Sequence, residues 1–253
     1  MPSDALSTWV ISCLLLGLRT VPIFAFAPPF SLLRMPTLFL VLFGLGLSIC
    51  LVGTYPEASL AANANLAVIV LSAFRELTLG LMFVLIFQIV FGALYLAGRT
   101  IDIQAGYGFA LLIDPTSQAQ TPLVGTLFAY AAGAAFFAFG GHINLLGLLA
   151  ASLNAVPLGA WIMPDPLSRI LAFMSTAFLT AFGVAGGSIF ALFMVDMVIA
   201  MLSRTVPQMN VLVLGFQVKT IVLFLVLPTS FGIGSALLLR MMVMTLNALP
   251  RMF

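Results

Sequence analysis

Residues 66–97 read LAVIVLSAFRELTLGLMFVLIFQIVFGALYLA, an apolar stretch whose only charged residues are the adjacent pair Arg75 and Glu76. A transmembrane helix needs about 20 consecutive, mostly apolar residues, so this stretch is long enough to cross a bilayer. It lacks the alternation of polar and apolar residues that is typical of a strand in a membrane β-barrel. The stretch therefore predicts a long helix whose surface is covered by lipid or by protein.

The composition of the whole chain points to the same class. Of its 253 residues, 63% are hydrophobic and 6% are charged, and the mean hydropathy is +1.25. A soluble domain carries about 25% charged residues, so water cannot be the main solvent of this surface. We predict an all-α, polytopic membrane-type protein with broken long helices. Its other apolar stretches cover residues 6–27, 38–52, 123–151, 171–202 and 211–246.

Charge and motif content argue against several classes of function. The formal net charge is only +2, which gives no basis for nucleic-acid binding. The sequence has no phosphate-binding loop or dinucleotide fingerprint, and no nucleophilic side chain with a visible base partner. His142 has no acidic or cysteine neighbours with which to form a metal site. We expect no enzymatic activity, no cofactor and no metal.

The last third of the chain is predicted to be a helical hairpin. Asp165 followed by Pro166 is typical of a helix start, because aspartate caps the first turn and proline fits its first position. Pro207 interrupts the apolar pattern and predicts the turn between two helices. Within the second helix, Pro228 predicts a kink or a break.

Two loops are expected upstream of the hairpin, at residues 55–65 and 98–122. The second is much longer than a connection between two helices requires. Long loops in compact proteins usually carry a function. We therefore expect a functional role for residues 98–122.

Asp196 lies within FALFMVDMVIAML, residues 190–202. A charge at the centre of a bilayer costs about 2.5–3.5 kcal/mol, so such residues are usually paired or face a protein interior. We expect Asp196 to pair with Arg204, with Lys219 or with a partner subunit. Gly183 and Gly187, four residues apart, predict a helix face on which another helix can approach closely.

Two segments carry a resemblance to a known family. They are GRTIDIQAGYGFALLIDPTSQAQTPLVG, residues 98–125, and LSRTVPQMNVLVLGFQVK, residues 202–219. Both resemble, in the same order, signature stretches of the FliR/SctT family of type III secretion export-gate proteins. REL at residues 75–77 and GGH at residues 140–142 are similar more weakly. One residue departs from the family pattern, because Gln217 stands where the family has proline.

The resemblance implies an assembly rather than a solitary bundle. It divides the chain into a FliP-like helical part, residues 1–164, and a FliQ-like hairpin, residues 165–253, that does not fold independently. It implies one copy of the chain with FliP and FliQ in a helical hetero-oligomer, associated with FlhB and FlhA and contacting membrane lipids. The implied location is the bacterial inner membrane at the flagellar basal body, and the implied cargo is unfolded flagellar subunits.

The resemblance also assigns roles to individual residues. It implies that the loop at residues 98–122 plugs the closed pore through Gly106, Tyr107, Gly108, Phe109, Ala110, Leu111, Leu112, Ile113, Asp114 and Pro115. Structural or subunit-contacting polar roles are expected for Arg75, Glu76, Asp102, Asp196, Arg204, Pro207, Gln208, Asn210 and Lys219.

Three alternatives remain open. The chain could be a multi-pass secondary transporter with an intramembrane site at Asp196, although no second half resembles residues 171–246, as an inverted repeat would require. It could be the SctT-type equivalent in an injectisome. It could also be a scaffold without a role in the pore, in which case residues 98–122 would tolerate deletion.

Overall fold

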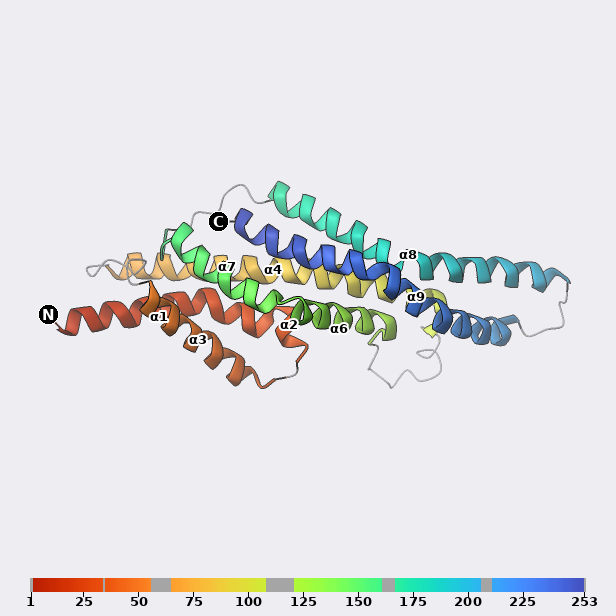
Figure 1. The fold of residues 1–253 in the computed structure, drawn as a ribbon, viewed down its shortest axis with the longest axis horizontal. Helices are drawn as coiled ribbons and strands as arrows, with labels where there is room; N and C mark the ends of the chain where they lie inside the picture. The colour runs from red at the N-terminus through yellow and green to blue at the C-terminus, as the bar shows by residue number, and fades with distance from the viewer. Residues whose placement is uncertain are drawn as a thin grey trace. The chain divides into compact units, whose positions relative to one another are not determined.

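The structure is a computed structural model that describes residues 2–33, 35–55, 65–107, 121–160, 167–205 and 211–252. Every regular element in these ranges is a helix (Figure 1). The elements are α1 (Pro2–Phe26), α2 (Pro28–Ser31), α3 (Thr37–Thr54), α4 (Leu66–Ala105), α6 (Leu123–Ala138), α7 (Gly141–Ala155), α8 (Leu167–Thr205), α9 (Val211–Ala248) and the 3-10 helix η3 (Leu249–Met252).

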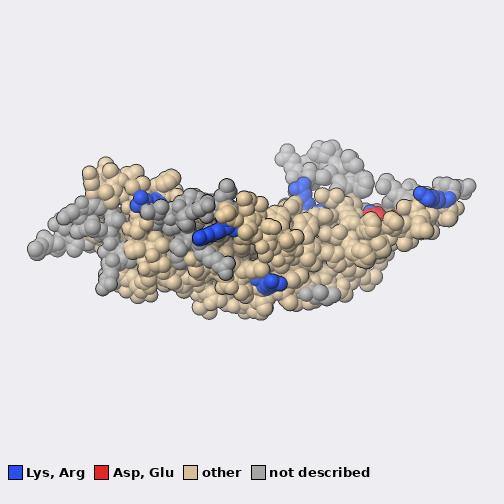
Figure 2. All heavy atoms as spheres, turned by 90° about the horizontal axis from the view of Figure 1, so that it is seen from above, with Lys and Arg blue, Asp and Glu red and all other residues tan. Residues whose placement is uncertain are grey.

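Five of the described helices are long and apolar enough to cross a membrane, or six if the interrupted pair α6 and α7 forms one span. Little of the apolar surface of the last two is covered by the chain itself, since only 22% of the apolar window of α8 and 17% of that of α9 are buried. Figure 2 shows one face of the molecule, on which Lys, Arg, Asp and Glu are few among other residues. The predicted all-α, polytopic membrane class is confirmed.

The chain forms two compact units. Unit 1 contains Met1–Ile89, Phe136–Phe173 and Met242–Phe253, and unit 2 contains Val90–Ala135 and Met174–Met241. Helices α4, α6, α8 and α9 each contribute residues to both units. Neither unit is therefore a contiguous stretch of sequence.

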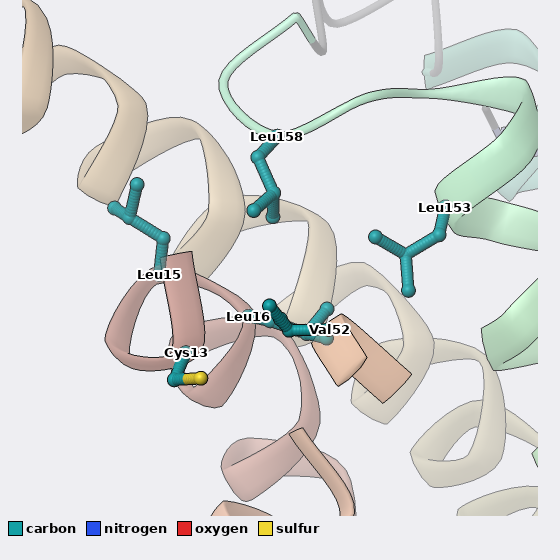
Figure 3. Packing of buried hydrophobic residues seen from close by; sticks show 6 residues of the cluster. All are labelled: Cys13, Leu15, Leu16, Val52, Leu153 and Leu158. Carbon is teal, nitrogen blue, oxygen red and sulfur yellow. The ribbon is translucent and has the colours of Figure 1, made fainter. Parts of the chain in front are cut away.

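In unit 1, α3 packs directly on α1 because glycine removes the side chain that would separate them. A Cβ atom on Gly44 would lie 2.9 Å from the Cα of Val21. The hydroxyl of Thr20 donates a hydrogen bond of 3.0 Å to the carbonyl oxygen of Gly44 at this contact. Nearby, α1, α3 and the α7 region enclose an apolar cluster, drawn in Figure 3, of Cys13, Leu15, Leu16, Val52, Leu153 and Leu158.

In unit 2, α8 and α9 run antiparallel, as the predicted hairpin requires. The buried hydroxyls of Ser188 and Ser230 lie 2.9 Å apart and form a hydrogen bond. A Cβ atom on Gly234 would lie 2.9 Å from Cγ1 of Val184, and one on Gly187 would lie 3.3 Å from Oγ of Ser230. The small-residue face predicted on α8 therefore packs against α9 of the same chain.

In two apolar stretches the structure decides whether and where the helix is interrupted. We expected a kink or a break at Pro228; helix α9 continues through this residue, so it is not broken there, and the kink stays a prediction. The stretch predicted as one helix at residues 123–151 is instead interrupted at Gly140, whose φ of 70° is left-handed. Proline removes only one backbone donor and keeps a helical φ, whereas a left-handed residue cannot continue a right-handed helix.

The loop predicted at residues 98–122 also begins later than expected, because α4 continues to Ala105. Ile101 and Ala105 are fully buried, so this last part of the helix is stabilised by packing. Its polar residue Asp102 is buried as well, with partners that a sequence pattern does not reveal.

Candidate functional site

The segment assigned to the pore plug lies mostly outside the described residues. Of its ten residues, the structure describes Gly106 and Tyr107, whereas Gly108–Pro115 lie in the gap between residues 107 and 121. Gly106 has a left-handed φ of 89° and ends α4. Within the described residues, the site consists of the two flanks of this segment, which are the end of α4 and the start of α6, and of the parts of unit 2 that hold them.

The two flanks meet at a pair of glycines. A Cβ atom on Gly98 of α4 would lie 2.5 Å from the Cα of Gly125 in α6. A Cβ atom on Gly125 would lie 2.7 Å from the carbonyl oxygen of Tyr95. Both distances are shorter than real Cβ contacts, so the two backbones cross here with no room for a side chain. The flanks are thereby held in direct contact.

One turn beyond Gly98, Asp102 caps the start of α6. The amide of Val124 donates to both carboxylate oxygens of Asp102 at 3.0 Å, and the amide of Gly125 donates to Oδ2 at 3.2 Å. Helix α6 begins after Pro122, whose side chain cannot accept a hydrogen bond from these free amides. A buried carboxylate from another helix takes the place of the usual cap and complements the positive end of the helix dipole.

The hairpin holds the other flank through Lys219. The ammonium nitrogen of Lys219 on α9 lies 2.5 Å from Oδ1 of Asp196 on α8. It also donates a hydrogen bond of 3.0 Å to the carbonyl oxygen of Gln104 in the last turn of α4. The ring of Tyr107 meets that of Phe216 edge-on, with centroids 6.1 Å apart. Of the partners considered for Asp196, the structure places Lys219 against it.

This arrangement holds two backbone segments in place. Its charged groups are occupied by helix ends or by each other, and the described part of the chain contains no group of three metal-ligating side chains. His142 packs beside Phe137, with ring centroids 5.6 Å apart. The chemistry that the site supports is the fastening of two helix ends.

The charged pair predicted from REL lies in unit 1 and is structural there. Glu76 forms a fully buried ion pair with Arg19, at 2.6 Å between Nε and Oε2 and 3.0 Å between Nη2 and Oε1. Arg19 also donates to Oγ of Ser152 at 3.0 Å, and the amide of Gly159 donates to Glu76 at 2.8 Å. Arg75 donates to the carbonyl oxygen of Gly159 at 2.8 Å.

Arg19 was not predicted as a functional or structural polar residue. The sequence nevertheless indicated such a role, because a single positively charged side chain within an apolar stretch must find a partner. Among the other predicted residues, Arg204 is exposed in the last turn of α8. Pro207, Gln208 and Asn210 lie outside the described residues.

Comparison with known proteins agrees with the motifs. The family model described as bacterial export proteins, family 1, matches residues 10–245. The flagellar biosynthetic protein FliR of Bacillus subtilis is 31% identical over 62% of this chain and 62% of its own length. FliR of Escherichia coli is 29% identical over 57% of this chain and 56% of its own length.

The similarity extends beyond flagellar proteins. The Yop proteins translocation protein T of Yersinia pestis is 30% identical over 60% of both chains. The match thus spans about three fifths of the length of these relatives. The resemblance to the FliR/SctT family is confirmed, and the chain belongs to the bacterial export proteins, family 1.

Proposed function

We propose that this chain is the FliR-type core subunit of a flagellar type III export gate. In this role it helps to form and plug the pore through which unfolded flagellar subunits cross the bacterial inner membrane. The observation that carries the proposal is the family match over residues 10–245, which includes both flanks of the predicted plug. Relatives named for flagellar biosynthesis and for Yop translocation support a role in protein export.

The proposed setting is a hetero-oligomer with FliP and FliQ at the flagellar basal body, associated with FlhB and FlhA. The exposed apolar surfaces of α8 and α9 support it, because large uncovered apolar patches on a protein mark contact with lipid or with partner subunits. The described part of unit 2 contributes Phe190, Phe193, Phe216 and Phe224 to these surfaces.

The division into a FliP-like part, residues 1–164, and a FliQ-like hairpin, residues 165–253, belongs to the same proposal. The antiparallel packing of α8 on α9 supports the hairpin. Both helices are shared between the two compact units, with Met174 and Met241 at the boundaries. This supports a hairpin that folds only with the rest of the chain.

For the plug itself, the proposal assigns Gly106–Pro115. Tyr107, Phe109, Leu111, Leu112 and Ile113 supply aromatic and aliphatic groups that can fill a lumen and exclude water and ions. The crossing of Gly98 and Gly125 supports the assignment, because it brings the two ends of the segment together.

The plug is tested by deleting residues 110–114 and measuring ion conductance across bilayers that contain the gate assembled with FliP and FliQ. We expect the deletion to raise conductance well above that of the unaltered gate, because the obstructing side chains are gone. Removal of five residues from the segment 57–61, which connects α3 to α4, is the matched control and should leave conductance low. Unchanged conductance in the deletion variant would contradict the assignment.

Assembly and system are tested separately. Copurification with FliP and FliQ followed by native mass spectrometry should give one copy of this chain per complex, whereas a stable solitary bundle would contradict the proposal. Restoration of motility in a strain lacking FliR distinguishes the flagellar system from an injectisome, whose SctT-type equivalent is the second candidate because of the Yersinia relative.

The ion pair of Asp196 with Lys219 weighs against a transporter, which would need that carboxylate for substrate.

A further inference from the structure

The ends of the described flanks are held by two polar anchors in unit 2. The first anchor is Asp102, which receives three hydrogen bonds from the amides of Val124 and Gly125. The second is Lys219, which joins Asp196 to the carbonyl oxygen of Gln104. One anchor therefore fixes the start of α6 and the other fixes the end of α4.

The two anchors differ in burial. Asp102 is 5% exposed, and its partners are backbone amides of a helix start that cannot turn away without losing the helix. The side chains of Lys219 and Asp196 are 18% and 42% exposed. A pair that the chain only partly encloses is held by less packing than one in the core, so a shift between helices separates it more readily. The second anchor is therefore the one that can open.

The contact of Lys219 with Gln104 has a clear physical basis. The last carbonyl groups of a helix have no partner within it and carry partial negative charge, so a cation is favoured there. The same ammonium group also pairs with Asp196 of α8. The Oε1 atom of Gln104 is buried without a hydrogen-bond partner in the described part of the chain. A buried acceptor without a partner costs free energy in this arrangement.

The aromatic contact beside this anchor follows the same face of α9. Phe216 lies three residues before Lys219, and residues at this spacing share one face of a helix. Its ring meets that of Tyr107, just after the end of α4. Gly215, one residue before Phe216, faces Ile199 of α8, and a Cβ atom on it would make an ordinary contact of 3.4 Å with Cδ1 of Ile199. The end of α4 is therefore held by contacts with the first part of α9, the second helix of the hairpin.

We infer that Lys219 is a positioning residue that latches the end of α4 to the hairpin of α8 and α9. The pair with Asp196 holds the latch closed, and Asp102 is the fixed anchor on the other flank. A movement of α8 relative to α9 separates Asp196 from Lys219 and releases Gln104 and Tyr107. The effect of this release on the pore rests on the proposed function, because it frees the start of the proposed plug.

The latch is tested by hydrogen exchange in the gate assembled with FliP and FliQ. Lys219→Met removes both contacts, Asp196→Asn removes only the ion pair, and Lys219→Arg keeps a cation that reaches both oxygens. We expect Lys219→Met to raise exchange of the amides of residues 103–106 about tenfold, since one charged hydrogen bond is lost. Asp196→Asn should raise it less, and Lys219→Arg least.

Two controls separate the latch from a general loss of stability. Arg240→Met removes the same charge from an exposed position of α9 and should leave exchange at residues 103–106 unchanged. The amides of Val124 and Gly125, which donate to Asp102, should exchange as in the unaltered gate in every variant. If Lys219→Met prevents assembly, the graded comparison of Asp196→Asn with Lys219→Arg gives the same test.

Equal exchange at residues 103–106 in all three variants and the unaltered gate would overturn the latch. Conductance of the same assembled variants tests the link to the pore. Raised exchange with raised ion leak supports both the latch and the proposed plug. Raised exchange with unchanged conductance keeps the latch and contradicts the plug, so the two proposals fail separately.

Discussion

At the scale of single residues, Arg19 shows how a charge is accommodated in an apolar bundle. Its side chain and that of Glu76 are fully buried, so both ions lose their hydration. Desolvation costs several kcal/mol per ion, and the hydrogen bonds to Glu76, Ser152 and Val156 offset that cost. Such a pair adds little net stability while it is intact, yet it is costly to leave half-made.

Glu76→Gln should therefore lower the free energy of unfolding by about 3–5 kcal/mol, because it leaves the buried charge of Arg19 uncompensated. The measurement is unfolding by sodium dodecyl sulfate of the detergent-solubilised gate assembled with FliP and FliQ, followed by circular dichroism. Arg75→Gln, at the neighbouring and partly exposed position, should cost about 1 kcal/mol through its single bond to Gly159. A cost at Glu76 no larger than at Arg75 would show that Arg19 has another source of compensation.

At the scale of elements, helix crossings in both units combine a glycine with a charged residue four positions away. Residues at this spacing lie on one face of a helix, so a glycine that lets two backbones touch also brings the charged group within reach of the neighbour. At the first crossing, a Cβ atom would meet the carbonyl oxygen of Arg19 at 2.6 Å. The two pairs are Gly80 with Glu76 in unit 1 and Gly98 with Asp102 in unit 2.

Gly98→Ala tests this arrangement. The added methyl group meets the backbone of Gly125, which cannot move aside as a side chain could, so we expect a loss of about 1–3 kcal/mol. Gly92→Ala is the matched control on the same helix, because a Cβ atom there meets nothing within 4 Å. It should be neutral or stabilise the chain by up to about 1 kcal/mol, since alanine favours the helix. Thermal unfolding in detergent distinguishes the two, and equal midpoints would refute a tight crossing.

At the scale of the whole molecule, the longest helices are longer than the hydrocarbon layer of a membrane is thick. Helices α4, α8 and α9 have 40, 39 and 38 residues. At 1.5 Å per residue these helices are about 57–60 Å long, roughly twice the 30 Å of the hydrocarbon layer. Membrane helices tilt by up to about 40°, which is not enough to remove the difference. Part of the exposed apolar surface of these helices therefore lies outside the hydrocarbon layer, and the proposed assembly with other subunits would cover it.

Met174 and Leu202, both exposed on the part of α8 in unit 2, provide a measurement of this. They lie about 42 Å apart along the helix, so at most one of them can contact acyl chains. Nitroxide labels at cysteines placed there, in a variant without Cys13 and Cys50, should show high oxygen accessibility at one position at most in the reconstituted gate. The buried position Leu192 is the low-accessibility control. High accessibility at both sites would mean that lipid alone surrounds α8.

The sequence by itself determined the class of the molecule, its family and the hairpin in its last third. The hydropathy of a helix is the sum of the contributions of its residues, so it can be predicted from the sequence. The signature stretches at residues 98–125 and 202–219 are contiguous, so the family can be recognised from the sequence as well. The local rule for Pro228 left a kink and a break open, and the structure decided only that α9 is not broken there.

Only the tertiary structure decided which charged groups meet and where α4 ends. Arg19 and Glu76 are 57 positions apart, and Asp102 caps a helix that begins after a long intervening segment. Such pairings depend on where two helices cross. A crossing is set jointly by glycines on both helices, as at Gly98 of α4 and Gly125 of α6. No local pattern contains that information, because the free energy of a pair belongs to the geometry between elements rather than to either element alone.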